Sequence, residues 1–133
     1  MKAVLDTNVL IDGHFELEDE FQLAVASISF AELRFGADRK GLSPSERALR
    51  AQRLTALEQR FASGLPFDDR AAASYGTIAR LTEDSGRAVR GRAVDLMIAA
   101  VAHSNGAVLV TSNLPDFAPL RPVLSVVPPT STP

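Results

Sequence analysis

Four acidic residues, widely separated along the chain, are the strongest candidates for chemistry. They are Asp6, Glu32, Asp95 and Asp116. All four map to one edge of a predicted parallel sheet, where gathered carboxylates raise one another's pKa values and destabilise the fold unless a cation neutralises them. Oxygen ligands without His or Cys select a hard ion, Mg²⁺ or Mn²⁺. The pattern therefore predicts a metal site that can align a phosphodiester and activate water.

Three of these acids also have an ordinary structural interpretation. Asp6 ends the apolar run "KAVLD" and could cap the next helix, although Asn8 could serve as that cap as well. Glu32 follows Ser29 with the Ser-x-x-Glu spacing of a capping box at a helix start. Asp116 lies in "TSNLPDF", where Asn, Pro and Asp are expected in any loop. Each of the three is therefore weak evidence when taken alone.

Asp95 is the most informative of the acids. On a helix its neighbours are Ile98, Ala99 and Ala102, so its face is predicted to be apolar. A carboxylate that faces a core is costly unless a positive group compensates it. An ion pair with Arg92 and metal ligation are the two interpretations of Asp95.

Strands alternate with helices along the chain. Four short apolar runs predict buried parallel strands: "KAVLD", "LAVASIS", "GAVLVTSN" and "VLSVV". Helical patterns lie between these runs and cover residues 29–39, 43–62, 68–84 and 92–106. This alternation predicts an α/β fold with a mostly parallel sheet covered on both faces. In such sheets, chemistry gathers beyond the carboxyl ends of the strands.

The best-defined helix is the one over residues 43–62. Ser43 is its expected cap, Pro44 takes the first helical position, and Glu46 closes a capping box. Gly64 follows its end. Its apolar stripe could serve a core or an interface equally well.

The composition is that of one ordinary domain. The chain has 133 residues, 46% hydrophobic and 23% charged, and it contains no cysteine, which excludes a disulfide framework and thiolate metal sites. There is neither an apolar run long enough for a membrane span nor a signal-peptide pattern, so we expect a cytoplasmic protein. We expect one domain over residues 1–127 and a disordered tail over residues 128–133.

Basic residues are concentrated in the later part of the chain. Only Lys2 precedes Arg34, and the stretch "GRAVRGR" contains Arg87, Arg90 and Arg92. Arginine suits bidentate contact with phosphate. Solvated helix faces are the ordinary alternative, so a polyanionic substrate is permitted and not required.

Four blocks together give the chain a family resemblance. "VLDTNVLI", "SFAEL", "DLMIAAVA" and "LVTSNLPDF" stand in the order and spacing of the PIN-domain ribonucleases, and the chain most resembles the VapC-like toxins of bacterial toxin–antitoxin modules. The resemblance implies a three-layer α/β/α sandwich and an acidic Mg²⁺ or Mn²⁺ pocket. It also implies an endoribonuclease that cuts tRNA or rRNA loops, a cognate VapB-like antitoxin, and a homodimer within a possibly larger complex.

The resemblance assigns the acids position by position. Asp6, Glu32 and Asp95 match the family's first three acids. At the fourth, many relatives carry Asp where this chain has Asn113, whereas Asp116 matches a variant found in other members. Which of these two completes the site, and whether one metal or two are held, stays open.

Further residues are expected to support the site. Thr7 and Thr111 match positions that support the acids through hydroxyl hydrogen bonds, with Asn8 and Asn113 beside them. For RNA binding, the candidates are Arg87, Arg90 and Arg92.

Other functions remain possible on these residues. Asn113 mildly favours a catalytically weak PIN-like binding module, and a housekeeping RNA-processing nuclease is a further alternative. A phosphotransferase with Asp6 as nucleophile is disfavoured because Asn8 replaces the usual second Asp and Lys2 and Lys40 are the only lysines. There is no G-x-S-x-G or P-loop motif.

Overall fold

A parallel sheet forms the centre of the molecule, which the computed structural model describes over residues 1–130. Its strand order is β2-β1-β3-β4, and every neighbouring pair is parallel. The strands are β1 (Lys2–Leu5), β2 (Gln22–Val25), β3 (Val108–Val110) and β4 (Val126–Val127). Each expected apolar run overlaps one of them, with β2 beginning one residue before its run, so the predicted parallel sheet is confirmed.

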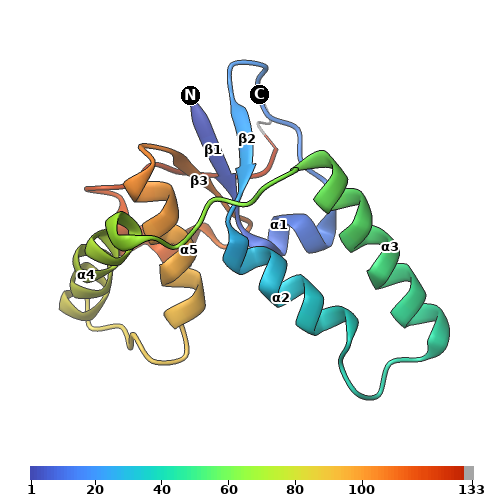
Figure 1. Cartoon of the computed structure of the whole chain (residues 1–133). Helices are drawn as coiled ribbons and strands as arrows, with labels where there is room; N and C mark the ends of the chain where they lie inside the picture. Colours follow the sequence, from blue (N-terminus) through green and yellow to red (C-terminus); the bar gives the residue numbers. More distant parts are fainter. Residues whose placement is uncertain (131–133) are drawn as a thin grey trace.

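Helices cover both faces of this sheet. They are α1 (Thr7–Asp12), α2 (Ser27–Ala37), α3 (Pro44–Arg60), α4 (Asp69–Asp84), α5 (Ala93–Ser104) and the 3₁₀ helix η1 (Leu114–Leu120). The helices α4 and α5 lie on one side of the sheet, and α2 and α3 form a hairpin on the other (Figure 1). The expected α/β/α sandwich is therefore confirmed. Within residues 1–130, no helix is both long and apolar enough to cross a membrane.

Alternation along β1 builds two separate cores. Val4 and Leu109 pack into the cluster beneath α4, α5 and η1. Ala3, Leu5 and Val110 point the other way, into the cluster that contains residues of α1 and α2. Because successive side chains of a strand face opposite sides, one short apolar run can supply both layers.

The predicted boundaries of α3 are correct at its start. Ser43 Oγ accepts a hydrogen bond from Glu46 N at 3.1 Å, and Ser43 N donates to Glu46 Oε1 at 3.4 Å, which forms the expected capping box. The helix ends at Arg60, slightly earlier than expected. Leu54 and Leu57 of its apolar stripe are partly buried against the hydrophobic cluster on this side of the sheet, so the stripe contributes to the core.

The start of α2 differs from the prediction. The helix begins at Ser27, after Ala26, which makes no side-chain capping bond; Ser29 and Glu32 therefore lie inside the helix, and the expected capping box between them is wrong. Leu65 explains the early start: its N–H donates to Val25 O at 2.8 Å and its carbonyl accepts from Ser27 N at 2.9 Å. Pairing with this distant segment satisfies a helix N–H that a side chain would otherwise cap.

Part of the expected tail is held against the protein. Glu16 N donates to Pro129 O at 2.9 Å, and Glu16 and Thr130 form a parallel bridge. Residues 129 and 130 of the tail that we expect to be disordered therefore contact Glu16, and the domain boundary at residue 127 stays a prediction. Residues 131–133 lie outside the described part of the chain.

The contact between Gly64 and Ser27 leads to a stability prediction. A Cβ atom at Gly64 would lie 2.7 Å from Ser27 Oγ and 2.8 Å from Ser27 N. Gly64→Ala should therefore lower the free energy of unfolding by about 1–3 kcal/mol, as overpacking usually does. Urea denaturation measures the change.

Gly76→Ala is the matched control. A Cβ there would meet no atom within 4 Å, and the position is inside α4. Alanine should leave stability unchanged or raise it by up to about 1 kcal/mol. Equal destabilisation by both substitutions would contradict the steric argument.

Candidate active site

The candidate site lies where β1, β2 and β3 end. The arrowheads of β1 and β2 point toward the starts of α1 and α2 (Figure 1). Asp6 directly follows β1, and Thr111 directly follows β3. The parallel arrangement therefore brings together residues that are more than 100 positions apart, as the hydrogen bond between these two confirms.

Asp6 is buried, with 3% of its surface exposed, and both of its carboxylate oxygens accept hydrogen bonds. Oδ1 accepts from Thr7 N at 2.8 Å, and Oδ2 accepts from Thr111 Oγ1 at 2.9 Å. Asp6 is the N-cap of α1, so its capping role is real and Asn8 is not the cap. A carboxylate has about four acceptor sites, so capping leaves room for a cation.

The environment of Asp6 disfavours its charged form. Its pKa is raised from 3.8 to about 6, first by burial and then by the negative charges of Asp95 and Glu32. The hydrogen bonds from Thr111 and Thr7 act in the opposite direction and are too weak to offset these effects. An ionised Asp6 is thus incompletely compensated by the protein alone.

Thr111 is fully hydrogen-bonded around its hydroxyl. Its single proton goes to Asp6, and its oxygen accepts from Asn113 N at 3.1 Å and from Asn8 Nδ2 at 3.4 Å. Asn8 Oδ1 in turn accepts from Ser112 N at 3.4 Å. Asn113 therefore contacts Thr111 through its backbone, a bond that an Asp at this position could make equally well.

Glu32 is held by the hydroxyls of Thr7 and Ser29, of which only that of Thr7 is predicted from the sequence. Thr7 Oγ1 donates to Glu32 Oε1 at 2.6 Å and lies 2.8 Å from Ser29 Oγ. The hydrogen bond of Thr7 was expected, whereas Ser29 was interpreted only as a helix cap. The i, i+3 spacing of Ser29 and Glu32 was the available signal, because it places two residues on one helix face.

Asp95 lies in the first turn of α5 and is exposed, so the prediction that it faces the core is wrong. Burial along this helix begins at Leu96, one residue later. Partial removal from water raises the pKa of the Asp95 carboxyl, the negative charge of Asp116 raises it further, and Arg92 lowers it. The charge of Asp95 therefore raises the pKa of Asp6, and the charge of Asp116 raises the pKa of Asp95.

The predicted RNA-binding arginines mostly contact η1. Arg92 donates to Asp116 O at 3.2 Å, and its guanidinium lies 3.6 Å from Asp116 Oδ1. Arg87 donates to Pro115 O at 2.6 Å, whereas Arg90 is exposed. The ion-pair partner of Arg92 is thus Asp116, and not Asp95, for which an ion pair with Arg92 was one of two interpretations.

The donor set fits a hydrated hard cation. Among residues 1–130, no three acidic or histidine side chains are grouped closely enough to ligate an ion by themselves. Mg²⁺ usually keeps several waters and takes only one or two protein carboxylates. The raised pKa values of Asp6 and Asp95 show that negative charge is poorly compensated here, and hydroxyl donors hold Asp6 and Glu32, which suits such an ion.

The raised pKa of Asp6 predicts a pH-dependent stability in the metal-free protein. Between about pH 4 and pH 6 the folded form binds more protons at Asp6 than the unfolded form does. The free energy of unfolding in EDTA should therefore fall by roughly 2–3 kcal/mol as pH rises through this window. Asp6→Asn should remove this decline, which urea titrations at several pH values measure.

Asp12→Asn provides the control, because Asp12 is an exposed acid at the end of the same helix. This variant should keep the pH dependence of the parent protein. An unchanged decline in Asp6→Asn would show that other groups cause it.

Comparisons with known proteins agree with this geometry. The family model described as PIN domain matches residues 3–118. Among solved structures, a member of the VapBC family of toxin–antitoxin systems, VapBC-5 from Mycobacterium tuberculosis, is 32% identical with a TM-score of 0.78 and 98% coverage of both chains. Comparison with curated protein sequences gives no match.

Two further solved structures have the same fold. A DNA-bound VapBC from Salmonella typhimurium is 27% identical with a TM-score of 0.75, covering 96% of this chain and 98% of that one. FitAcB from Neisseria gonorrhoeae is 25% identical with a TM-score of 0.75, covering 96% and 97%.

Proposed function

The chain belongs to the PIN-domain family and is VapC-like, and from that premise we propose that it is a Mg²⁺- or Mn²⁺-dependent endoribonuclease, the toxin of a toxin–antitoxin pair. The observation that carries the proposal is the buried carboxylate of Asp6, whose pKa is raised beside the charges of Asp95 and Glu32. These charges would repel an RNA phosphate, so a cation is needed between the acids and the substrate.

Asp6 and Asp95 are the residues we propose as direct ligands, with Glu32 and Asp116 acting directly or through bound water. A bound Mg²⁺ or Mn²⁺ would supply an activated water and stabilise the leaving oxygen of the phosphodiester. Thr7 and Thr111 orient the carboxylates by donating hydrogen bonds to them. The protein would therefore hold the negative charges of these carboxylates in a fixed arrangement before the substrate binds.

We propose looped or single-stranded RNA, from tRNA or rRNA, as the substrate. Arg90 is exposed close in sequence to the start of α5, where Asp95 lies. A guanidinium there can contact a phosphate while unpaired bases remain accessible. Arg87 and Arg92 would contribute mainly by holding η1, and with it Asp116, beside the site.

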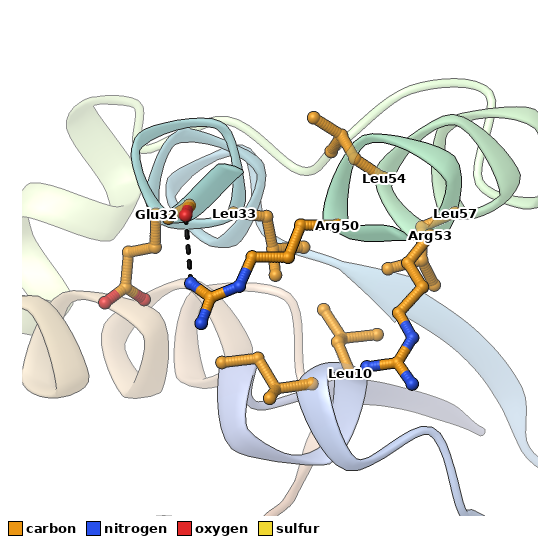
Figure 2. Close-up of a pocket in the computed structure, with 9 residues that line it drawn as sticks. Leu10, Glu32, Leu33, Arg50, Arg53, Leu54 and Leu57 are labelled. Atoms are coloured by element: carbon orange, nitrogen blue, oxygen red, sulfur yellow. Dashed lines mark hydrogen bonds between the residues drawn. The ribbon is translucent and has the colours of Figure 1, made fainter. Parts of the chain in front are cut away.

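A groove between α1, α2 and α3 is the proposed antitoxin site (Figure 2). Its apolar lining comes from Leu10, Ile11, Leu33, Leu54 and Leu57. Arg50 and Arg53 add positive charge, and Glu32 lies at one end (Figure 2). We infer that an antitoxin segment with apolar and acidic side chains would fill the groove and reach Glu32, in line with the toxin–antitoxin complexes named among the similar structures.

Homodimerisation, within a larger complex with the antitoxin, is the assembly implied by the family resemblance. It stays a prediction for this chain. Sedimentation of the purified protein, alone and with its antitoxin, measures it.

Removing one candidate ligand tests the enzymatic proposal. Asp6→Asn and Asp95→Asn should each lower Mg²⁺-dependent cleavage of labelled RNA hairpins at least about 100-fold, because metal catalysis supplies several kcal/mol of transition-state stabilisation. EDTA should abolish cleavage by the parent protein. Glu83→Gln, at an exposed acid near the end of α4, should cleave normally.

Cleavage that persists in EDTA would refute the metal proposal, and cleavage unaffected by Asp6→Asn or Asp95→Asn would refute the assigned site. No cleavage and no binding of Mg²⁺ or Mn²⁺ at millimolar concentration would instead favour a binding module.

The groove has its own test. Ile11 is 59% exposed at the groove, so Ile11→Glu should leave the fold intact and place a charge against an apolar partner. Binding to the cognate VapB-like antitoxin should weaken by about 10- to 100-fold, as loss of an interface hot spot does. Calorimetry measures it, and Val123→Glu, at an exposed valine that does not line the groove, should bind normally.

A further inference from the structure

We propose that Ser29 is a positioning residue that fixes Glu32 for metal binding through the hydroxyl of Thr7. The inference rests on the proposed function, because it concerns how one ligand of that same site is held. It assigns a role to Ser29, which the candidate ligand set does not include.

The direction of the hydrogen bonds follows from the donors available. An ionised carboxylate only accepts, so at the 2.6 Å contact Thr7 Oγ1 must donate its single proton to Glu32 Oε1. Thr7 and Ser29 are also in contact, with 2.8 Å between Thr7 Oγ1 and Ser29 Oγ. Because the proton of Thr7 is already donated to Glu32, Ser29 must be the donor in this bond. The chain of donors therefore runs from Ser29 to Thr7 to Glu32.

Burial makes this chain more than a surface contact. Ser29 has 0% of its surface exposed and Thr7 has 8%. With little water available to replace either partner, each hydroxyl depends on the other, and hydrogen bonds in such a chain strengthen one another. The bond to Glu32 is charge-assisted, which makes it the strongest of the set.

Thr7 joins two of the candidate ligands. Its N–H donates to Asp6 Oδ1 at 2.8 Å while its hydroxyl donates to Glu32 Oε1. The same residue thus holds acids that follow two different strands, and the bond from Ser29 prevents its hydroxyl from rotating away from Glu32. Ser29 therefore controls the separation of the two carboxylates.

Without the hydrogen bond from Thr7, two effects would favour movement of the Glu32 side chain away from the site. The negative charges of Asp6 and Glu32 repel each other, and Glu32 is only partly buried. A free Glu side chain also gains rotamer entropy when it is released into solvent. The two hydroxyls oppose both effects and keep the carboxylate at the site before an ion binds.

The test is the affinity for Mn²⁺ measured by calorimetry, which does not depend on cleavage. Ser29→Ala and Thr7→Val should each weaken Mn²⁺ binding by about 3- to 10-fold, the loss of one buried hydrogen bond. Ser29 and Thr7 act through the same chain of hydrogen bonds. Ser29→Ala in the Thr7→Val background should therefore weaken Mn²⁺ binding by less than about 2-fold further. Ser29→Thr keeps the hydroxyl, so it should retain most of the Mn²⁺ affinity that Ser29→Ala loses.

Ser27→Ala is the control, because Ser27 is exposed on the same helix. This variant protein should bind Mn²⁺ with the affinity of the parent. Ser29→Ala that lowers the melting temperature but leaves Mn²⁺ affinity unchanged would overturn the inference, and so would additive losses in the double variant. A parent protein that binds no Mn²⁺ would overturn the proposed metal site and this inference with it. If the parent binds Mn²⁺ but cuts no RNA, only the proposed reaction fails, and the affinity series still tests the role of Ser29.

Discussion

A carboxylate buried at the end of the central strand is the constraint around which this site is arranged. Asp6 lies where burial and neighbouring negative charge both oppose its ionisation. The protein offsets only part of that cost, with one hydrogen bond from a backbone N–H and one from a threonine hydroxyl. Under the proposed function, a bound cation would offset the rest of this cost. The carboxylate is kept in place because Asp6 also caps α1. The side chain that we propose as a metal ligand is thus also a structural helix cap.

The fold could be predicted well because its signals are local. A buried parallel strand is a continuous apolar run, and the Ser43 capping box is complete within four residues. The start of α2 could not be predicted in this way, because it depends on Leu65, which lies far along the chain. A serine followed three residues later by a glutamate suits both a helix cap and a shared helix face, and only the tertiary pairing decides between them.

The contacts at the sheet edge could be predicted only in part from the sequence. The edge of the sheet follows from strand order, so Asp6 and Thr111 could be placed there from sequence. Asp95 was expected to face the core, but residues 93–95 at the start of α5 are exposed and burial begins only at Leu96. Similarly, a basic stretch predicts contact with a polyanion, while Arg92 pairs with Asp116. Net charge along a sequence does not reveal which charges are already used within the protein.

The pairing of Leu65 with the end of β2 has a consequence for self-association. β2 is an outer strand of the sheet, and Leu65 bridges only to Ala26 at its carboxyl end. The amino-terminal part of β2 has no further neighbouring strand among residues 1–130, and such edges can recruit another chain into a growing sheet. The segment that leads into this edge is rich in acid, with Glu18, Asp19 and Glu20 just before it. Electrostatic repulsion between copies would therefore protect this edge against edge-to-edge aggregation when the protein is abundant.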